Sequence, residues 1–253
     1  MIEAAVLAFS LILARVGTFV ATLPLFGGSD VPRVVKIGLT FGLSCLWFGS
    51  GLPSLDGLVA SAGVGWPPYV LALAREAVLG AVLGFAFGLI FVPLRVAGEY
   101  IGQEMGLALA PLVDPTSDNP AAVVTQVFEM LGMLLFLGLD GHHAFLAGLH
   151  VTFVHWPIGG TGGLPGIPFL VRGASAAQEW GLLLAAPIGI CLFATTVLLT
   201  LFARAAPQLN TFSVGMALRV VVGLVATIVL LPSMVAALVN IFSRLTDFVY
   251  RLV

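Results

Sequence analysis

The chain has 253 residues, of which 60% are hydrophobic and only 9% are charged, and its formal net charge is −2. Soluble domains carry about 25% charged residues, so this composition, with a mean hydropathy of +1.13, excludes an ordinary soluble domain. The lack of a basic excess argues against a nucleic-acid-binding protein. The apolar runs are nearly continuous, whereas membrane barrel strands would be about 10 residues long with strict alternation. The sequence therefore predicts an all-α, polytopic membrane protein broken by proline and glycine.

Six apolar runs of membrane-spanning length follow one another along the chain. They cover Ala4–Phe26, Val34–Leu52, Val70–Leu94, Ala121–Leu139, Trp180–Phe202 and Phe212–Phe242. No basic segment precedes the first run, so we expect it to remain in the mature protein rather than to be cleaved as a signal peptide. Pro93 is predicted to kink or end the third run. After the fourth run, Ala144–Phe153 either continues that helix or lies at the membrane interface, and Pro157–Gly173 is predicted to be a flexible loop.

Charged side chains within or beside these runs are a first indication of function. They are Arg15, Glu76, Glu99, Glu104, Glu129 and Arg219. A charge that faces lipid is costly, so these residues are expected to face protein or water and to form ion pairs. Two interpretations stay open for each of them: part of a route for an ion or substrate, or a structural ion pair within a larger assembly.

Two sets of glycines spaced four residues apart lie on either side of Pro93, and this spacing places each set on one helix face. They are Gly80, Gly84 and Gly88, and then Gly98, Gly102 and Gly106. Small residues let membrane helices approach closely. We therefore expect tight packing against a partner helix, in this chain or in another, and interpret the first five of these glycines as candidate assembly contacts. For Gly98–Gly106 a functional hinge stays open as the alternative, because prolines follow directly.

The segment Ala97–Asn119 interrupts the apolar chain with acidic residues and prolines. The prolines end the glycine-faced helix, and irregular backbone at membrane depth is tolerated only where protein or a water-filled cavity surrounds it. We predict that Gly106–Asn119 is a plug within a pore, where apolar side chains exclude water. The plug residues are Gly106, Leu107, Leu109, Pro111, Leu112, Val113, Asp114 and Pro115. The alternative is a connecting loop packed against a neighbour.

A short polar turn, Arg204–Asn210, separates the last two apolar runs. Its proline and asparagine favour a defined turn over a flexible one. We expect the turn to fix a hairpin of the last two helices and to contribute to a subunit contact. The contact residues are Arg204, Pro207, Gln208 and Asn210.

Catalytic and metal chemistry find little support in the sequence. There is no His-Glu-x-x-His motif and no convincing pair of nucleophile and base, so we predict no enzyme and no cofactor. Asp140, His142 and His143, with His150 and His155 further on, are possible metal ligands. No second ligand cluster supports a metal site. The preferred interpretation is that these residues cap and polarise the end of a membrane helix near water.

Short motifs occur in a fixed order over nearly the whole chain. They are Arg15-Val16-Gly17, Leu23–Gly27, Val31–Val34, Ala97–Gly102, Met105-Gly106, Asp114-Pro115, Phe136-Leu137, Gly141-His142, Arg204–Asn210 and Phe212–Gly215. Together they resemble the family of the flagellar biosynthetic protein FliR and its injectisome relatives. One departure is Asp140, where that family's pattern has asparagine before Gly141-His142.

The resemblance implies a core subunit of the type III protein export gate, which secretes unfolded flagellar proteins across the bacterial inner membrane during assembly of the flagellum. The implied partners are FliP-like and FliQ-like gate subunits, with FlhA-like and FlhB-like components of the basal body. The resemblance also implies one integral membrane domain, with a FliP-like part at Met1–Leu170 and a FliQ-like hairpin at Val171–Val253. In related proteins a loop at the position of Gly106–Asn119 occupies the closed pore.

Three alternatives are kept open. An injectisome subunit would belong to the virulence branch of the same family. A small-molecule secondary transporter would show broken helices and intramembrane charge as well, but it should also show an inverted repeat, and none is evident. An intramembrane enzyme would need a catalytic constellation that the sequence does not provide.

Overall fold

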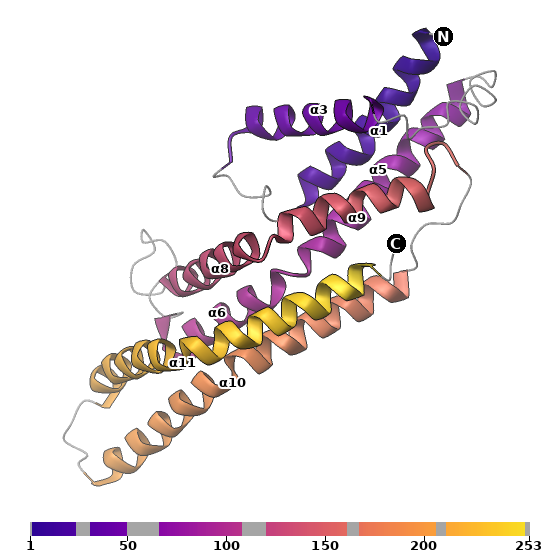
Figure 1. Ribbon diagram of the computed structural model, residues 1–253. Helices are drawn as coiled ribbons and strands as arrows, with labels where there is room; N and C mark the ends of the chain where they lie inside the picture. Colours follow the sequence, from indigo (N-terminus) through magenta and orange to yellow (C-terminus); the bar gives the residue numbers. More distant parts are fainter. Residues whose placement is uncertain are drawn as a thin grey trace. The chain divides into compact units, whose positions relative to one another are not determined.

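The computed structural model describes residues 2–23, 31–49, 66–107, 120–160, 167–205 and 211–250. Over these residues the regular structure is helical and no strand occurs, so the all-α prediction is confirmed (Figure 1). The helices are α1 (Ile2–Thr22), α3 (Arg33–Gly49), α5 (Trp66–Gly88), α6 (Val92–Glu104), α8 (Pro120–Gly138), α9 (Gly141–His155), α10 (Ile167–Ala205) and α11 (Thr211–Tyr250).

Four of the described helices, α1, α5, α10 and α11, are long and apolar enough to cross a membrane. Helices α8 and α9, separated by a short break, pass the same test together, which raises the number of spans to at most five. These helices agree with the prediction of a polytopic membrane protein. The number is lower than the six apolar runs, in part because α3 has only 17 residues, whereas a span needs about 20.

Proline sets the break between α5 and α6. Helix α5 ends at Gly88, and α6 begins at Val92 with Pro93 in its first turn. A proline is tolerated there because the first N–H groups of a helix have no intrahelical partner. The predicted break of the third apolar run is confirmed.

Two boundaries differ from the sequence-based expectation. Residues 144–153 do not continue the preceding helix, because α9 begins separately at Gly141. The loop predicted over Pro157–Gly173 is wrong from Ile167 onward, where α10 begins. Pro168 occupies the first turn of that helix, a position that suits proline, and the residues after it carry no further proline before Pro187.

The chain divides into two compact units, each assembled from separate segments. Unit 1 comprises Met1–Leu89, Asp140–Gly173 and Leu245–Val253, and unit 2 comprises Ile90–Leu139 and Ala174–Arg244. The division at Leu170 into a FliP-like and a FliQ-like part stays a prediction, because it concerns similarity to other proteins rather than contacts within this chain.

In unit 1, α1 packs along α5 and is joined by α3 and α9 (Figure 1). Edge-to-face aromatic pairs join the helices. The ring centroids of Phe19 on α1 and Phe87 on α5 are 5.7 Å apart, and those of Phe87 and Phe145 on α9 are 4.5 Å apart. Phe9 of α1 meets Phe41 of α3 in the same way at 5.7 Å. Such pairs add about 0.5–1.5 kcal/mol to the burial of their apolar area.

In unit 2, three helices each present a glycine to a side chain of α6 or of its C-cap, Met105. A Cβ atom would meet Leu94 at Gly132 of α8, Tyr100 at Gly189 of α10, and Met105 at Gly223 of α11. These large side chains therefore occupy space that the absence of a glycine side chain leaves free. Helices α10 and α11 lie side by side and run in opposite directions, as the hairpin prediction requires, with Leu199 beside Gly215 (Figure 1).

Candidate functional site

Arg15, in the middle of α1, is a fully buried charge of unit 1. Its side chain and that of Glu76 on α5 are both fully buried. Arg15 Nε donates to Glu76 Oε2 at 2.5 Å. A charge-assisted bond of this kind is among the stronger hydrogen bonds in proteins, and it compensates part of the cost of removing two charges from water.

The remaining donors of Arg15 reach the end of α9. Nη1 donates to the carbonyl oxygen of Thr152 at 3.1 Å, and Nη2 donates to that of Trp156 at 2.8 Å. The guanidinium also lies 4.5 Å from the ring centroid of Phe153. The carbonyl oxygen of Thr152 also accepts the N–H of the C-cap Trp156. The C-terminal end of a helix carries partial negative charge, so the guanidinium of Arg15 stabilises that end of α9.

Glu76 extends this network to the segment that follows α9. Its Oε1 accepts a hydrogen bond from the backbone N–H of Gly159 at 3.3 Å, and it lies 3.8 Å from Arg75 Nη1. The network therefore holds α1, α5, α9 and residues 156–160 together. This geometry supports the structural interpretation of Arg15 and Glu76 over a route for an ion.

The other charges singled out from the sequence lie in unit 2, in varied environments. Glu99 is exposed and pairs with Arg95, one turn earlier on α6, at 3.0 Å. The hydrogen bond and charge of Glu99, and more weakly the charge of the exposed Glu129, raise the pKa of Arg95. Glu104 is half-buried. Arg219 is half-buried as well, and its Nε is a buried donor without a hydrogen-bond partner among the described residues.

The first glycine face packs within the chain. A Cβ atom at Gly80 would overlap the carbonyl oxygen of Arg15, and one at Gly84 would overlap the side chain of Thr22. The sequence left open whether the partner helix belongs to this chain or to another. In the structure, α1 of the same chain packs against Gly80 and Gly84. Gly88 is also buried. A role of these three residues in contacts with other subunits stays a prediction.

The second glycine face lies on α6. A Cβ atom at Gly98 would lie 2.6 Å from Thr125 Cα, so α6 and α8 meet there backbone to backbone. Gly102 is buried. Gly106 has φ of +82°, and it follows the C-cap Met105. A left-handed residue after the C-cap is a common way to end a helix and favours glycine.

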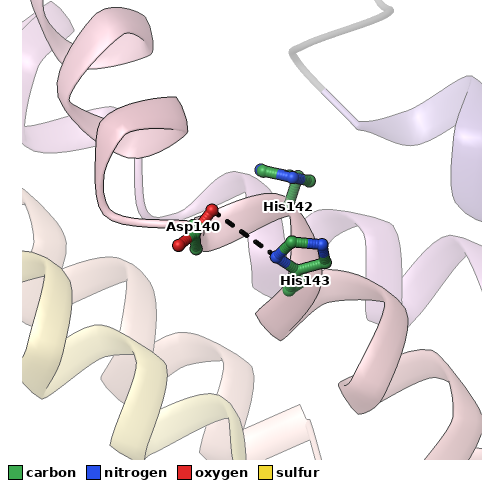
Figure 2. Close-up of side chains that lie close together, drawn as sticks. All are labelled: Asp140, His142 and His143. Carbon is green, nitrogen blue, oxygen red and sulfur yellow. Dashed lines mark ion pairs between the residues drawn. The ribbon is translucent and has the colours of Figure 1, made fainter.

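The turn before α9 brings together three side chains of unit 1: Asp140, His142 and His143 (Figure 2). Asp140 has φ of 56° and ψ of 27°, and its side chain makes no capping hydrogen bond to α9. The absence of this bond concerns α9 only, so the expectation that these residues cap and polarise the end of the preceding membrane helix stays a prediction. The left-handed backbone of Asp140 explains why its carboxylate does not cap α9, because a capping side chain needs the extended backbone typical of an N-cap. Its Oδ1 instead lies 3.5 Å from His143 Nδ1.

Several members of these sites were not found by sequence analysis. Thr152, Trp156 and Gly159 take part through backbone atoms, which leave no signal in residue type. Trp47 of α3 donates to His150 Nδ1 at 3.3 Å. These two residues are 103 positions apart, and no motif links them.

Comparison of the sequence with known proteins identifies the family of this chain. The chain matches the family model described as Bacterial export proteins, family 1, over residues 6–245. The chain belongs to this family. The resemblance suggested by the short motifs is therefore confirmed.

Three relatives of this bacterial export protein are flagellar biosynthetic proteins FliR. That of Escherichia coli (strain K12) is 34% identical over 92% of this chain and 87% of the relative. The FliR protein of Pectobacterium carotovorum subsp. carotovorum is 33% identical over 92% of this chain and 87% of the relative. The FliR protein of Bacillus subtilis (strain 168) is 27% identical over 93% of this chain and 90% of the relative.

Part of the site predicted for this bacterial export protein lies outside the described residues. Of the plug, only Gly106 and Leu107 are described, and both are half-buried. Of the turn, Arg204 and Ala205 are described, and both are exposed in the last turn of α10. Pro207, Gln208 and Asn210 lie outside the described residues.

The helices of this bacterial export protein expose large apolar side chains, many of them on α3, α10 and α11. Among those more than half exposed are Val34, Ile37, Ile190, Phe193, Ile228 and Val229. Soluble monomers rarely expose apolar patches larger than a few hundred Å². These faces are therefore expected to meet lipid or other protein chains.

Proposed function

We propose that this bacterial export protein is a core subunit of the flagellar type III export gate and helps to form the channel through which unfolded flagellar proteins cross the inner membrane. The observation that carries the proposal is the similarity to FliR proteins over 92–93% of the chain. The proposal gives the chain a structural part in the channel and no catalytic step.

FliP-like and FliQ-like gate subunits are the proposed partners, with FlhA-like and FlhB-like components of the basal body beside them. Two observations support association with other chains. Large apolar side chains cover the outer faces of α3, α10 and α11. The buried Nε of Arg219 has no partner among the described residues, and an unpaired buried donor costs about 1–3 kcal/mol, which a contact with another chain can relieve.

The experiment that tests the proposal is affinity purification of the tagged chain from membranes of its own bacterium, combined with deletion of its gene. We expect FliP-like and FliQ-like proteins to copurify, and the deletion to abolish secretion of flagellar proteins and motility. Loss of effector secretion with intact motility would favour the injectisome alternative. A stable, partner-free protein whose deletion spares secretion would contradict the proposal.

The plug at Gly106–Asn119 remains a proposal that rests on the sequence. One structural observation is compatible with it: α6 ends at Glu104, and Gly106 adopts the left-handed conformation that ends a helix. The regular helix therefore stops where the plug was predicted to begin.

A further inference from the structure

Three side chains with metal-binding atoms meet at the surface of unit 1. Asp140 directly precedes α9, and His142 and His143 lie in the first turn of that helix. All three are exposed, and one ligand atom from each lies within 4.8 Å of the others. Figure 2 shows the three side chains on the same turn, with the carboxylate of Asp140 directed toward the His143 ring.

The backbone of Asp140 makes its carboxylate available. An aspartate before a helix ordinarily accepts hydrogen bonds from the first N–H groups of that helix. In the left-handed conformation, with φ of 56°, Asp140 makes no such bond. Its carboxylate is therefore not used by the helix and lies beside an imidazole instead.

The two imidazole rings lie next to each other. Their centroids are 4.2 Å apart and their planes are inclined by 37°. A nitrogen of one ring lies within 4.8 Å of a nitrogen of the other, so both rings can offer a ligand atom to the same ion.

We propose that Asp140, His142 and His143 form a binding site for a divalent transition-metal ion such as Zn²⁺. Imidazole nitrogen and carboxylate oxygen are ligands of zinc, nickel and copper. Ligand atoms around tetrahedral zinc lie roughly 3.3–3.5 Å apart, so small rotations of these exposed side chains close the site. The fourth position is left for water or for a side chain of another chain.

The test is titration of the full-length chain, purified in detergent with a tag that contains no histidine, with Zn²⁺ in a calorimeter. The variants are Asp140→Asn, His142→Gln and His143→Gln. The matched control is His155→Gln, because His155 is an exposed histidine in the last turn of the same helix. Asparagine tolerates the left-handed region at least as well as aspartate, so Asp140→Asn removes the ligand charge without disturbing the turn.

We expect one Zn²⁺ per chain, with affinity weakened about tenfold or more by each of the three variants and unchanged by His155→Gln. Affinity should also fall as the pH is lowered, because protons compete for the imidazole nitrogens. Absence of saturable binding, or binding that Asp140→Asn leaves unchanged, would overturn the proposal. Neither readout depends on export, so the result is independent of the proposed function.

Discussion

Arg15 illustrates how an arginine is accommodated inside an apolar helix pair. Its donors meet one carboxylate and two backbone carbonyls in separate directions. A guanidinium offers five N–H donors in a rigid fork, whereas a lysine ammonium is a point charge with three. The site therefore requires the shape of arginine as well as its charge.

Glu76→Gln should destabilise the chain by about 3–5 kcal/mol, because it leaves Arg15 as a buried charge without its counter-ion. Arg15→Lys should also destabilise it, because lysine cannot reach Glu76, Thr152 and Trp156 together. The measurement is thermal unfolding of the detergent-purified chain. The control is Arg95→Gln, which removes an exposed pair worth about 0–1 kcal/mol. If Glu76→Gln and the control Arg95→Gln lost equal thermal stability, the structural role of the network would be contradicted.

Gly106→Ala should destabilise the chain by about 1 kcal/mol, because an L-residue at φ of +82° is strained. Gly42→Ala is the matched control, because Gly42 lies inside α3 and, apart from its own helix backbone, no atom of the described residues lies within 4 Å of the position that a Cβ atom would occupy there. Alanine should therefore be neutral or stabilising at this position. Thermal unfolding of both variants compares the two sites. Equal stability of Gly106→Ala and the parent chain would show that the end of α6 does not need a glycine.

At the scale of helices, close approach of α1 and α5 depends on glycine. Gly84→Leu should prevent α1 from packing on α5, because even a Cβ atom overlaps Thr22 there. We expect loss of the folded chain itself, measured as its level in membranes, and not only loss of assembly. Gly42→Leu, at an open site on α3, should leave that level unchanged. Normal accumulation of Gly84→Leu would show that α1 and α5 can move apart without destabilising the chain.

The turn Arg204–Asn210 should act through assembly. Arg204 is exposed at the end of α10, so Arg204→Ala removes no packing within the described chain and should leave its level unchanged. We expect Arg204→Ala and Asn210→Ala to lower copurification of gate subunits and secretion of flagellar proteins in parallel. Intact assembly with failed secretion would instead place the turn at the channel and contradict the assignment.

Features encoded within a few residues of one another were predictable from sequence, and features that join distant segments were not. Pro93 indicated the end of α5 because proline acts on its own backbone. The partner of Arg15 was not identifiable, because Glu76 is 61 residues away and several other carboxylates were possible. The left-handed backbone of Asp140 was missed because aspartate adopts that conformation only occasionally, so its presence alone does not signal it.

In the whole molecule, the buried contacts include paired charges, whereas the exposed helix faces are apolar. Buried charge is satisfied inside unit 1 by Glu76 and by the end of α9, so that unit needs no other chain to neutralise Arg15. The outer faces of α3, α10 and α11 are apolar. Apolar exposure is therefore the main feature that these outer faces offer for contact with lipid or with other subunits.

The last prediction concerns Leu109–Pro115, the centre of the proposed plug. Leu109, Leu112 and Val113 are apolar, and we predict from the sequence that the neighbouring prolines, which lack a backbone N–H, interrupt helical hydrogen bonding there. A narrow apolar constriction excludes water and therefore ions. Deleting Leu109–Pro115 should leave the assembled complex intact, since the glycine faces and the Arg15 network lie elsewhere, but should make the membrane permeable to small ions.

The measurement is conductance of membranes, or growth under ionic stress, in cells that express the deletion variant together with its partners. A second variant replaces the same seven residues with glycine and serine. It keeps the length of the connection but removes the apolar side chains, so it should leak as well. Copurification of the partners verifies assembly in both cases. If both complexes assemble and neither conducts more than the parent, Gly106–Asn119 is a connecting loop packed against a neighbour, and the seal of the channel lies in another part of the gate.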